Sequence, residues 1–327
     1  MVEKIIELLS SPILGSLAIS LAVIAAFASM IDTFRRILRT IPVSYRISIL
    51  GLPRSGKTAL ISAMFAELFA TSGETLFPVG SETINRANRL IAHIDSGRPI
   101  PPTVEKDAFI FRFLYYVRSF FFSRIRYEGE IVDFPGEMSE KLLESAADGT
   151  LDDDIGIFSK EFYSWVISSR VVVFTIDVAA YLLADEQRHH VAQLTSEIRA
   201  AWQSLNDESA KAHAPRERRV ALVFTKMDVA RLFESTDSGD VFDDQRLSKA
   251  ALEAPIDGVI DVELSNYDKA VVDFKGILES DFEELISFFR RREKAFDTFF
   301  TSAYFKASGA RFGVKELLAF LLPRRTY

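Results

Sequence analysis

The chain has 327 residues, enough for one large α/β domain or two small ones, and 48% of them are hydrophobic. Its formal net charge of −7 argues against a nucleic-acid-binding protein, which normally carries a basic excess. The absence of cysteine excludes disulfides, thiolate zinc sites and cysteine nucleophiles.

The first predicted element is an uncharged apolar segment, Leu8–Ile31. As a helix of roughly 24 residues it would be about 36 Å long, enough to cross a bilayer core of about 30 Å. Arginines at positions 35, 36, 39 and 46 follow it, so the positive-inside rule places the rest of the chain in the cytoplasm. We therefore expect a short tail (1–7), a single-pass transmembrane helix (8–31) and a basic neck (32–43) that suits anionic headgroups.

Two alternatives compete with this anchor. A cleaved signal peptide is one, but its basic residues would lie on the other flank. A buried core helix is the other, but little sequence precedes the segment to pack against it. The anchor is the interpretation that fits both flanks.

The second feature is a glycine-rich loop, GLPRSGKT, at Gly51–Thr58. The run before it, Ser44–Leu50, is short, apolar and β-branched, which predicts a buried strand. After it, apolar residues recur at helical spacing from Leu60 to Phe69. A strand, a loop and a helix form the context that the phosphate-loop pattern G-x-x-x-x-G-K-[ST] requires.

Such a loop wraps a phosphate with its backbone at the start of a helix, where the macrodipole favours anions. Lys57 would neutralise the β- and γ-phosphates, and the Thr58 hydroxyl would hold Mg²⁺. An ordinary Gly-containing turn is the alternative. The predicted nucleotide contacts of the loop are Gly51, Pro53, Arg54, Ser55, Gly56, Lys57 and Thr58.

The next two predicted strands are Asp107–Val117 and the run from Arg124, which are expected to pair antiparallel. The second strand ends in Asp-Phe-Pro-Gly, the pattern D-x-x-G. Asp133 at that strand end would hold Mg²⁺ through water, and the Gly136 N–H would sense a γ-phosphate. The pattern is weak alone and gains its meaning from following the glycine-rich loop.

Two further apolar runs predict buried parallel strands, Arg170–Ala180 and Arg219–Asp228, with a helix at Gln187–Leu205 between them. The second run ends in Thr-Lys-Met-Asp, which matches [NT]-K-x-D. Thr225 belongs to this word, Lys226 would lay its stem along a purine, and Asp228 would accept bonds from guanine N1–H and N2–H₂. The alternative is a surface lysine beside a helix-capping aspartate.

Near the end, a helix at Ser280–Arg290 leads to a strand in Lys294–Phe305, and a last helix covers Val314–Leu322. Ser302 and Ala303 follow that strand, where a backbone N–H would meet guanine O6. All four words therefore follow predicted strands, at the carboxyl ends where open α/β sheets bind ligands. Their order is the one that assembles a pocket for GTP.

With these words the chain resembles the Ras-like P-loop GTPases over roughly residues 44–322. The resemblance implies an α/β P-loop fold, with a mixed, mainly parallel six-stranded sheet between helices and with GTP and Mg²⁺ bound at its top. The GTPase domain would cover 44–327, with inserts around 138–169 and 230–256. The sequences of two short segments, GLPRSGKTALISA and IVDFPGE, also resemble those of the bacterial YcjX-like GTPases. The architecture, a GTPase domain with a membrane anchor, resembles the β subunit of the signal recognition particle receptor.

Two departures from the family concern catalysis. The family's switch I threonine, a ligand of Mg²⁺, has its best counterpart in Thr103, with Thr75 and Thr83 as alternatives. Glu137 stands where many members carry the glutamine that orients the attacking water. The expected catalytic residues are therefore Lys57, Gly136 and Glu137.

The sequence thus predicts a membrane-anchored protein that hydrolyses GTP to GDP and acts as a nucleotide-dependent switch. A GTP-binding scaffold with negligible hydrolysis and a P-loop ATPase are the alternatives. We expect a protein effector or activator at the switch regions and self-association as a second possibility, with no nucleic acid as partner.

Overall fold

The computed structural model describes residues 20–21, 23–30, 43–70, 76–98, 100, 108–118, 124–148, 157–211, 218–229, 260–261, 267–307 and 310–323. The chain divides into two compact units. The first comprises Met1–Val43, Tyr116–Tyr127 and Arg325–Tyr327, and the second comprises Ser44–Tyr115 and Glu128–Arg324. All four sequence words lie in the second unit.

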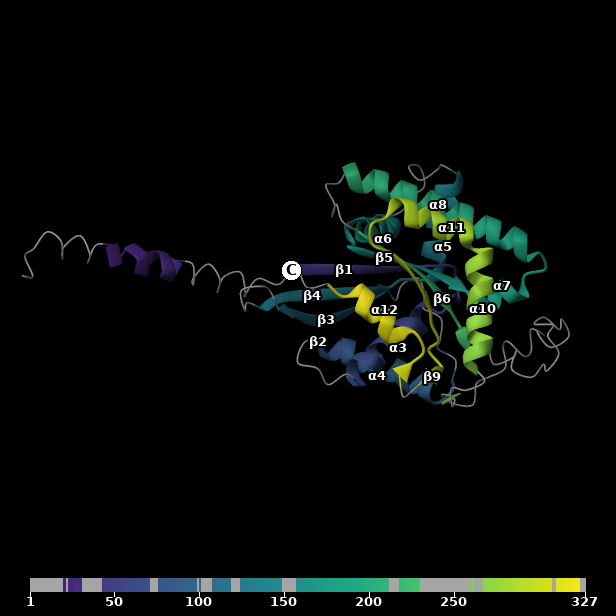
Figure 1. Cartoon of the computed structure of the whole chain (residues 1–327), viewed down its shortest axis with the longest axis horizontal. Helices are drawn as coiled ribbons and strands as arrows, with labels where there is room; N and C mark the ends of the chain where they lie inside the picture. Colours follow the sequence, from purple (N-terminus) through teal and green to yellow (C-terminus); the bar gives the residue numbers. More distant parts are fainter. Residues whose placement is uncertain are drawn as a thin grey trace, which may run out of the picture. The chain divides into compact units, whose positions relative to one another are not determined.

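The main sheet is mixed and has seven strands in the order β2-β3-β4-β1-β5-β6-β8 (Figure 1). β1 pairs with β5, β5 with β6 and β6 with β8, all in parallel, whereas β2 is antiparallel to β3. The strand bounds are β1 Val43–Leu50, β2 Leu76–Pro78, β3 Phe109–Arg118, β4 Arg124–Asp133, β5 Val171–Asp177, β6 Arg219–Thr225 and β8 Phe296–Phe300. A second, three-stranded sheet joins β7 Ile260–Asp261, β9 Phe305–Ala307 and β10 Ala310–Arg311.

The sequence analysis predicted six strands in the main sheet, and this number is wrong by one. The additional strand, β2, is three residues long and pairs with β3 at the edge of the sheet. A three-residue segment that ends in proline has too few positions to show an alternating pattern. Each of the other six strands overlaps a strand predicted from the sequence, with differences at the ends.

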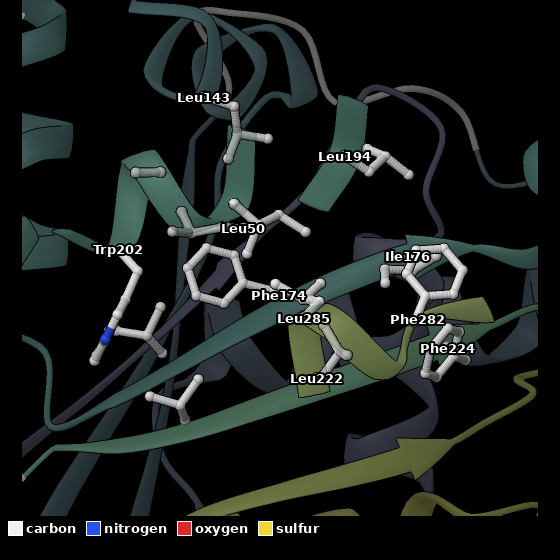
Figure 2. Close-up of a cluster of buried hydrophobic side chains, with 14 of the residues drawn as sticks. Leu50, Leu143, Phe174, Ile176, Leu194, Trp202, Leu222, Phe224, Phe282 and Leu285 are labelled. Atoms are coloured by element: carbon white, nitrogen blue, oxygen red, sulfur yellow. The ribbon is translucent and has the colours of Figure 1, made fainter. Parts of the chain in front are cut away.

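The central parallel strands form because they are buried on both faces. Every residue of β5 from Val171 to Ile176 is buried, and so is every residue of β6 after Arg219. Continuous apolar runs are typical of parallel strands that lie between two layers of helices. Figure 2 shows the resulting core, where Phe174 of β5 packs edge-on against Trp202 and where Phe224 of β6 lies near Phe282.

Helices cover both faces of the sheet. In Figure 1, α5, α6, α8 and α11 lie on one side and α3, α4 and α12 on the other. The helix bounds are α3 Lys57–Ala70, α4 Ser81–Asp95, α5 Gly136–Asp148, α6 Ile157–Ser168, α7 Val178–Leu183, α8 Gln187–Lys211, α10 Tyr267–Asp281, α11 Glu283–Arg292 and α12 Val314–Leu321. This is an α/β fold with a mixed sheet between two layers of helices, as predicted.

The predicted strand Arg170–Ala180 is too long. β5 ends at Asp177, and the short helix α7 begins directly after it. The physical reason is a helix cap: Asp177 Oδ1 accepts hydrogen bonds from the N–H groups of Ala179 and Ala180 at 2.9 and 3.2 Å. The apolar residues after Asp177 therefore continue the core as a helix.

The segment between α3 and β3 contains a helix that the sequence analysis did not predict, α4. Its buried residues Thr83, Ala87, Leu90 and Ile94 follow at intervals of four, three and four. That spacing is the signal of one buried helical face and was present in the sequence. The insert predicted around 138–169 contains most of α5 and all of α6, and both contribute side chains to the main core.

The predicted membrane anchor lies mostly outside the described residues. Within Leu8–Ile31, the structure describes residues 20–21 and 23–30, which are helical and exposed. No helix in the described part of the chain is long and apolar enough to cross a membrane. The basic neck to residue 42 and the predicted insert at 230–256 also lie outside the described residues.

Candidate nucleotide-binding site

The glycine-rich loop lies between the end of β1 and the start of α3, as predicted. Two of its residues have positive φ angles, Arg54 at 63° and Gly56 at 83°. A positive φ is uncommon for a residue with a side chain, and alternation of such conformations turns backbone N–H groups into one concave surface. The Arg54 side chain is exposed, and the Ser55 N–H closes the turn on the Leu52 carbonyl at 3.2 Å.

Lys57, the first residue of α3, directs its ammonium group back onto this loop. Its Nζ donates hydrogen bonds to the carbonyls of Gly51 at 2.8 Å and Leu52 at 2.7 Å. Burial lowers the pKa of Lys57 to about 8, against the opposing effect of nearby carboxylates, of which Asp133 is the strongest. A phosphate bound at this loop would supply a negative charge next to the buried ammonium group and so favour its protonated form.

Thr58 and Asp133 are brought into contact although they are 75 residues apart. The Thr58 hydroxyl donates to both carboxylate oxygens of Asp133, at 2.9 and 3.1 Å. A hydroxyl and a carboxylate are oxygen ligands of the kind that Mg²⁺ uses together with water and phosphate oxygens. Among the described residues no group of three or more histidines and carboxylates could hold a metal alone, so substrate oxygens would have to complete the shell.

Gly136 lies directly against the glycine-rich loop. A Cβ atom at this position would be 2.4 Å from Pro53 Cα and 2.8 Å from Pro53 N, a distance that real Cβ atoms do not show. The start of α5 is therefore packed on the loop, with the exposed Glu137 as the next residue. All three catalytic residues predicted from the sequence, Lys57, Gly136 and Glu137, therefore lie around the glycine-rich loop.

Two threonines near the carboxyl ends of β5 and β6 bind the glycine-rich loop through hydrogen bonds. Thr175 Oγ1 lies 2.9 Å from Ser55 Oγ and donates to the Leu50 carbonyl at 3.1 Å. Thr225 Oγ1 donates to the Ser55 carbonyl at 2.7 Å. The sequence analysis identified Thr225 and missed Thr175, whose signal was a lone hydroxyl in the apolar run VVVFTID.

The two motifs assigned to recognition of the base, Thr225–Asp228 and Ser302–Ala303, also lie in contact. The Ser302 hydroxyl donates to Asp228 Oδ1 at 2.6 Å, and both residues are buried. The Met227 N–H donates to the Thr301 carbonyl at 3.1 Å, so the loops after β6 and β8 are joined by backbone as well. This arrangement leaves the Asp228 carboxylate fixed at one end of the site.

Lys226 is held by an acidic residue that the sequence analysis did not select. Its φ angle is 61°, and its Nζ forms an ion pair with Asp177 Oδ2 at 2.6 Å. Asp177 thus caps α7 with one oxygen and orients Lys226 with the other. Its signal in the sequence was its place at a strand end, in the same position as the predicted words.

The switch I threonine remains a prediction, because Thr103 and the alternative Thr75 lie outside the described residues. The second alternative, Thr83, lies on the buried face of α4. Its hydroxyl accepts a hydrogen bond from the Arg112 N–H at 3.3 Å, which fits a structural role better than contact with a phosphate.

A family model described as DO-GTPase2, Double-GTPase 2, matches residues 45–288. No curated protein matches the chain significantly.

Solved structures with similarity include a bacterial selenocysteine-specific elongation factor EF-Sec (15% identity, TM-score 0.32, covering 86% of this chain and 28% of that one). A second is Methanosarcina barkeri Roco2 RocCORdC bound to GDP (11%, 0.30, 86% and 50%). A third is the Arl6 BBS3 small GTPase from Trypanosoma brucei with bound GppNp (14%, 0.36, 85% and 95%). The chain thus spans less than two thirds of the first two structures. The narrower resemblance to YcjX-like GTPases stays a prediction.

The contact between Gly136 and Pro53 predicts the effect of a single methyl group. Gly136→Ala should force α5 and the loop apart and weaken the binding of a nucleoside triphosphate at least tenfold relative to a diphosphate, because the γ-phosphate is the group that the Gly136 N–H is predicted to contact. Titration of both nucleotides against the purified protein would measure this ratio.

Gly276→Ala is the matched control for this substitution. Gly276 lies in α10, and a Cβ atom there would meet nothing within 4 Å. The control should leave both affinities unchanged and stabilise the fold by about 0.5–1 kcal/mol, the gain expected in a helix. An unchanged affinity ratio in Gly136→Ala would contradict the assigned contact.

Proposed function

The chain belongs to the Double-GTPase 2 family, and we propose that it binds GTP with Mg²⁺ and hydrolyses it to GDP as a membrane-anchored switch. The observation that carries this proposal is the convergence of four sequence words. They follow β1, β4, β6 and β8, and each is linked by side-chain or backbone contacts to at least one of the others.

The support for guanine is the buried pair of Asp228 and Ser302. A carboxylate oriented by a 2.6 Å hydrogen bond would accept hydrogen bonds from the adjacent N1–H and N2–H₂ donors of guanine. Adenine lacks this pair of donors on that edge. The ATPase alternative gives Asp228 no role in recognising the base, which makes it the weaker interpretation.

The residues present also fit hydrolysis. Mg²⁺, when bound, would neutralise charge that develops on the phosphate oxygens, and Thr58 and Asp133 are the residues that would hold it. Lys57 would supply a second positive charge near the bond between the β- and γ-phosphates that breaks as water attacks the γ-phosphorus. Glu137 would accept a hydrogen bond from that water.

Glu137 also limits the rate. Its carboxylate is close enough to Lys57 to influence the pKa of the ammonium, so it would repel the phosphate oxygens as well. The Arg54 side chain is exposed, so its positive charge would be available to a partner protein rather than to a phosphate bound in the glycine-rich loop. We therefore propose that an activating protein or a second copy of the chain stimulates hydrolysis, and the scaffold with negligible hydrolysis is the limiting case.

For the membrane, we propose a single-pass anchor at Leu8–Ile31 with the GTPase domain on the cytoplasmic side. The support is the uncharged run and the arginines that follow it. In the described part of this run, Leu21, Ile24, Phe27 and Met30 each expose at least 60% of their surface. Apolar helical surface of this kind requires a covering environment, which a bilayer supplies.

The base assignment predicts a change of specificity. Asp228→Asn should weaken GTP binding at least tenfold, because charge-assisted bonds of about 1.5–3 kcal/mol are lost, and should favour xanthosine triphosphate, which presents a carbonyl at that edge. Competition titrations with both nucleotides measure the exchange. Asp297→Asn, an exposed aspartate at the start of β8, is the control, and unchanged GTP affinity in Asp228→Asn would rule out the guanine assignment.

The catalytic assignment predicts a rate. Single-turnover hydrolysis by the purified protein should be slow, on the order of 10⁻⁴–10⁻² s⁻¹, the range of unassisted and cis-arginine switches. Glu137→Gln should raise that rate severalfold by removing the repulsive charge. Glu144→Gln, an exposed glutamate further along α5, should not. An intrinsic rate above about 1 s⁻¹ would mean that the site needs no partner.

The anchor assignment predicts fractionation. The full chain should remain with membranes after carbonate extraction and need detergent, whereas a chain that begins near Thr40 should be soluble and still bind nucleotide. Replacing Leu21 and Ile24 by aspartate in the full chain should release it, because charges within the bilayer core are costly. Recovery of the unmodified full chain in the soluble fraction of gently lysed cells would exclude the anchor.

A further inference from the structure

The loop that follows β8 is held at both sides of Ser302 and Ala303. In the peptide unit before them, the Thr301 carbonyl accepts from the Met227 N–H and the Ser302 N–H donates to the Phe312 carbonyl, both at 3.1 Å. This unit therefore has both of its polar groups paired.

The peptide unit after them is paired as well. The Tyr304 N–H donates to Ser302 Oγ at 3.3 Å, and the Ala303 carbonyl accepts a hydrogen bond from the Arg311 guanidinium. In the unit between, the Ala303 N–H donates to no atom of the described residues. Since Ala303 is buried, its N–H needs an acceptor, and an atom of a bound ligand can supply one.

Arg311 is the residue that fixes this arrangement from the far side. Its side chain is 1% exposed, and its guanidinium forms an ion pair with Asp95 Oδ1 at 2.6 Å, at the end of α4. Its backbone N–H donates to Glu67 Oε1 of α3 at 2.7 Å. One buried side chain thus ties the Ala303 carbonyl to α4, while its backbone is tied to the helix that begins at the glycine-rich loop.

An arginine on a carbonyl is not in itself a binding device. Arg219 makes a comparable contact at the opposite end of the sheet, where it donates to the carbonyls of Phe320 at 2.7 Å and Leu322 at 2.6 Å. There the contacts cap the end of α12 and serve the fold. Arg311 differs because the carbonyl that it holds belongs to Ala303, whose N–H has no acceptor within the described part of the chain.

We infer that Arg311 is a positioning residue that orients the Ala303 N–H toward the oxygen at the six-position of the bound base. The inference rests on the proposed binding of GTP. The Ala303 N–H lies in the peptide unit between two units that are held by hydrogen bonds, and the contact of Arg311 with the Ala303 carbonyl restrains the second of these, so less ordering is needed when the N–H meets its acceptor. Asp95, which pairs with Arg311, stabilises the guanidinium in this position.

Two nucleotide analogues separate this contact from the one made by Asp228. In 6-thioguanosine triphosphate the oxygen is replaced by sulfur, a weaker acceptor, while both donors to Asp228 remain. Inosine triphosphate keeps the oxygen but lacks the amino group. The affinity ratio of GTP to the thio analogue therefore reports the Ala303 N–H, and the ratio of GTP to inosine triphosphate reports Asp228.

The experiment measures both ratios for the full chain and for Arg311→Met, with unfolding curves for each protein. Arg311→Met should lower the ratio of GTP to the thio analogue by about threefold to tenfold, the value of one hydrogen bond, and leave the inosine ratio within about twofold. Arg219→Met is the control and should change neither ratio. A folded Arg311→Met protein with an unchanged thio ratio would overturn the inference.

Asp95→Asn keeps the test decisive if Arg311→Met does not fold, because Asp95 is half exposed and its replacement is mild. It should lower the thio ratio by about twofold or more, and an unchanged ratio would again overturn the inference. If the unmodified chain distinguishes GTP from neither analogue, the proposed guanine specificity fails, and this inference fails with it.

Discussion

The site depends on the register of the parallel strands. Leu50 of β1 pairs with Phe174 of β5, and Phe224 of β6 pairs with both Ile176 of β5 and Phe300 of β8. These pairs align the carboxyl ends of four strands to within a few residues. A slip of one residue would exchange the side chains that each strand presents to the helix layers on its two sides, so close packing on both buried faces enforces the alignment. The hydroxyls, carboxylates and loops that follow are then brought together as a consequence of core packing.

The strands of the site could be predicted from the sequence because each is a continuous apolar run followed by a polar word. The sequence does not show which residues contact each motif in the folded protein. Asp177 caps a helix that looks like more strand, Thr175 is one hydroxyl in an apolar run, and Arg311 acts on residues 8 and 216 positions away. Such contacts are set by tertiary packing, which local periodicity cannot encode. The short edge strand β2 was missed because three residues are too few to show a pattern, whereas the buried face of α4 was visible in the sequence and was overlooked.

The helix after Gly136 constrains how the protein can respond to a nucleotide. Met138, Leu142 and Leu143 of α5 are buried in the main core, together with Phe162 of α6. Moving α5 as a unit would therefore expose apolar surface at roughly 25 cal/mol per Å², so a large displacement is costly. The change that costs least is a local one at the start of α5, where Gly136 touches Pro53. A signal from this site would then pass through the first turn of α5, next to Glu137.

Charge sets the remaining requirement. The buried ammonium of Lys57 is surrounded by carboxylates, with Asp133 first in effect, then Glu137, Glu140 and Asp177. A nucleoside triphosphate would add several negative charges to a region that already has more carboxylates than ammonium groups, in a chain whose net charge is −7. Attraction by the backbone of the loop and the start of α3 is worth at most about 2 kcal/mol, so it does not balance that excess alone. A divalent cation held by Thr58 and Asp133 would make binding favourable, and under the proposed mechanism a partner would supply the further positive charge that stimulates hydrolysis.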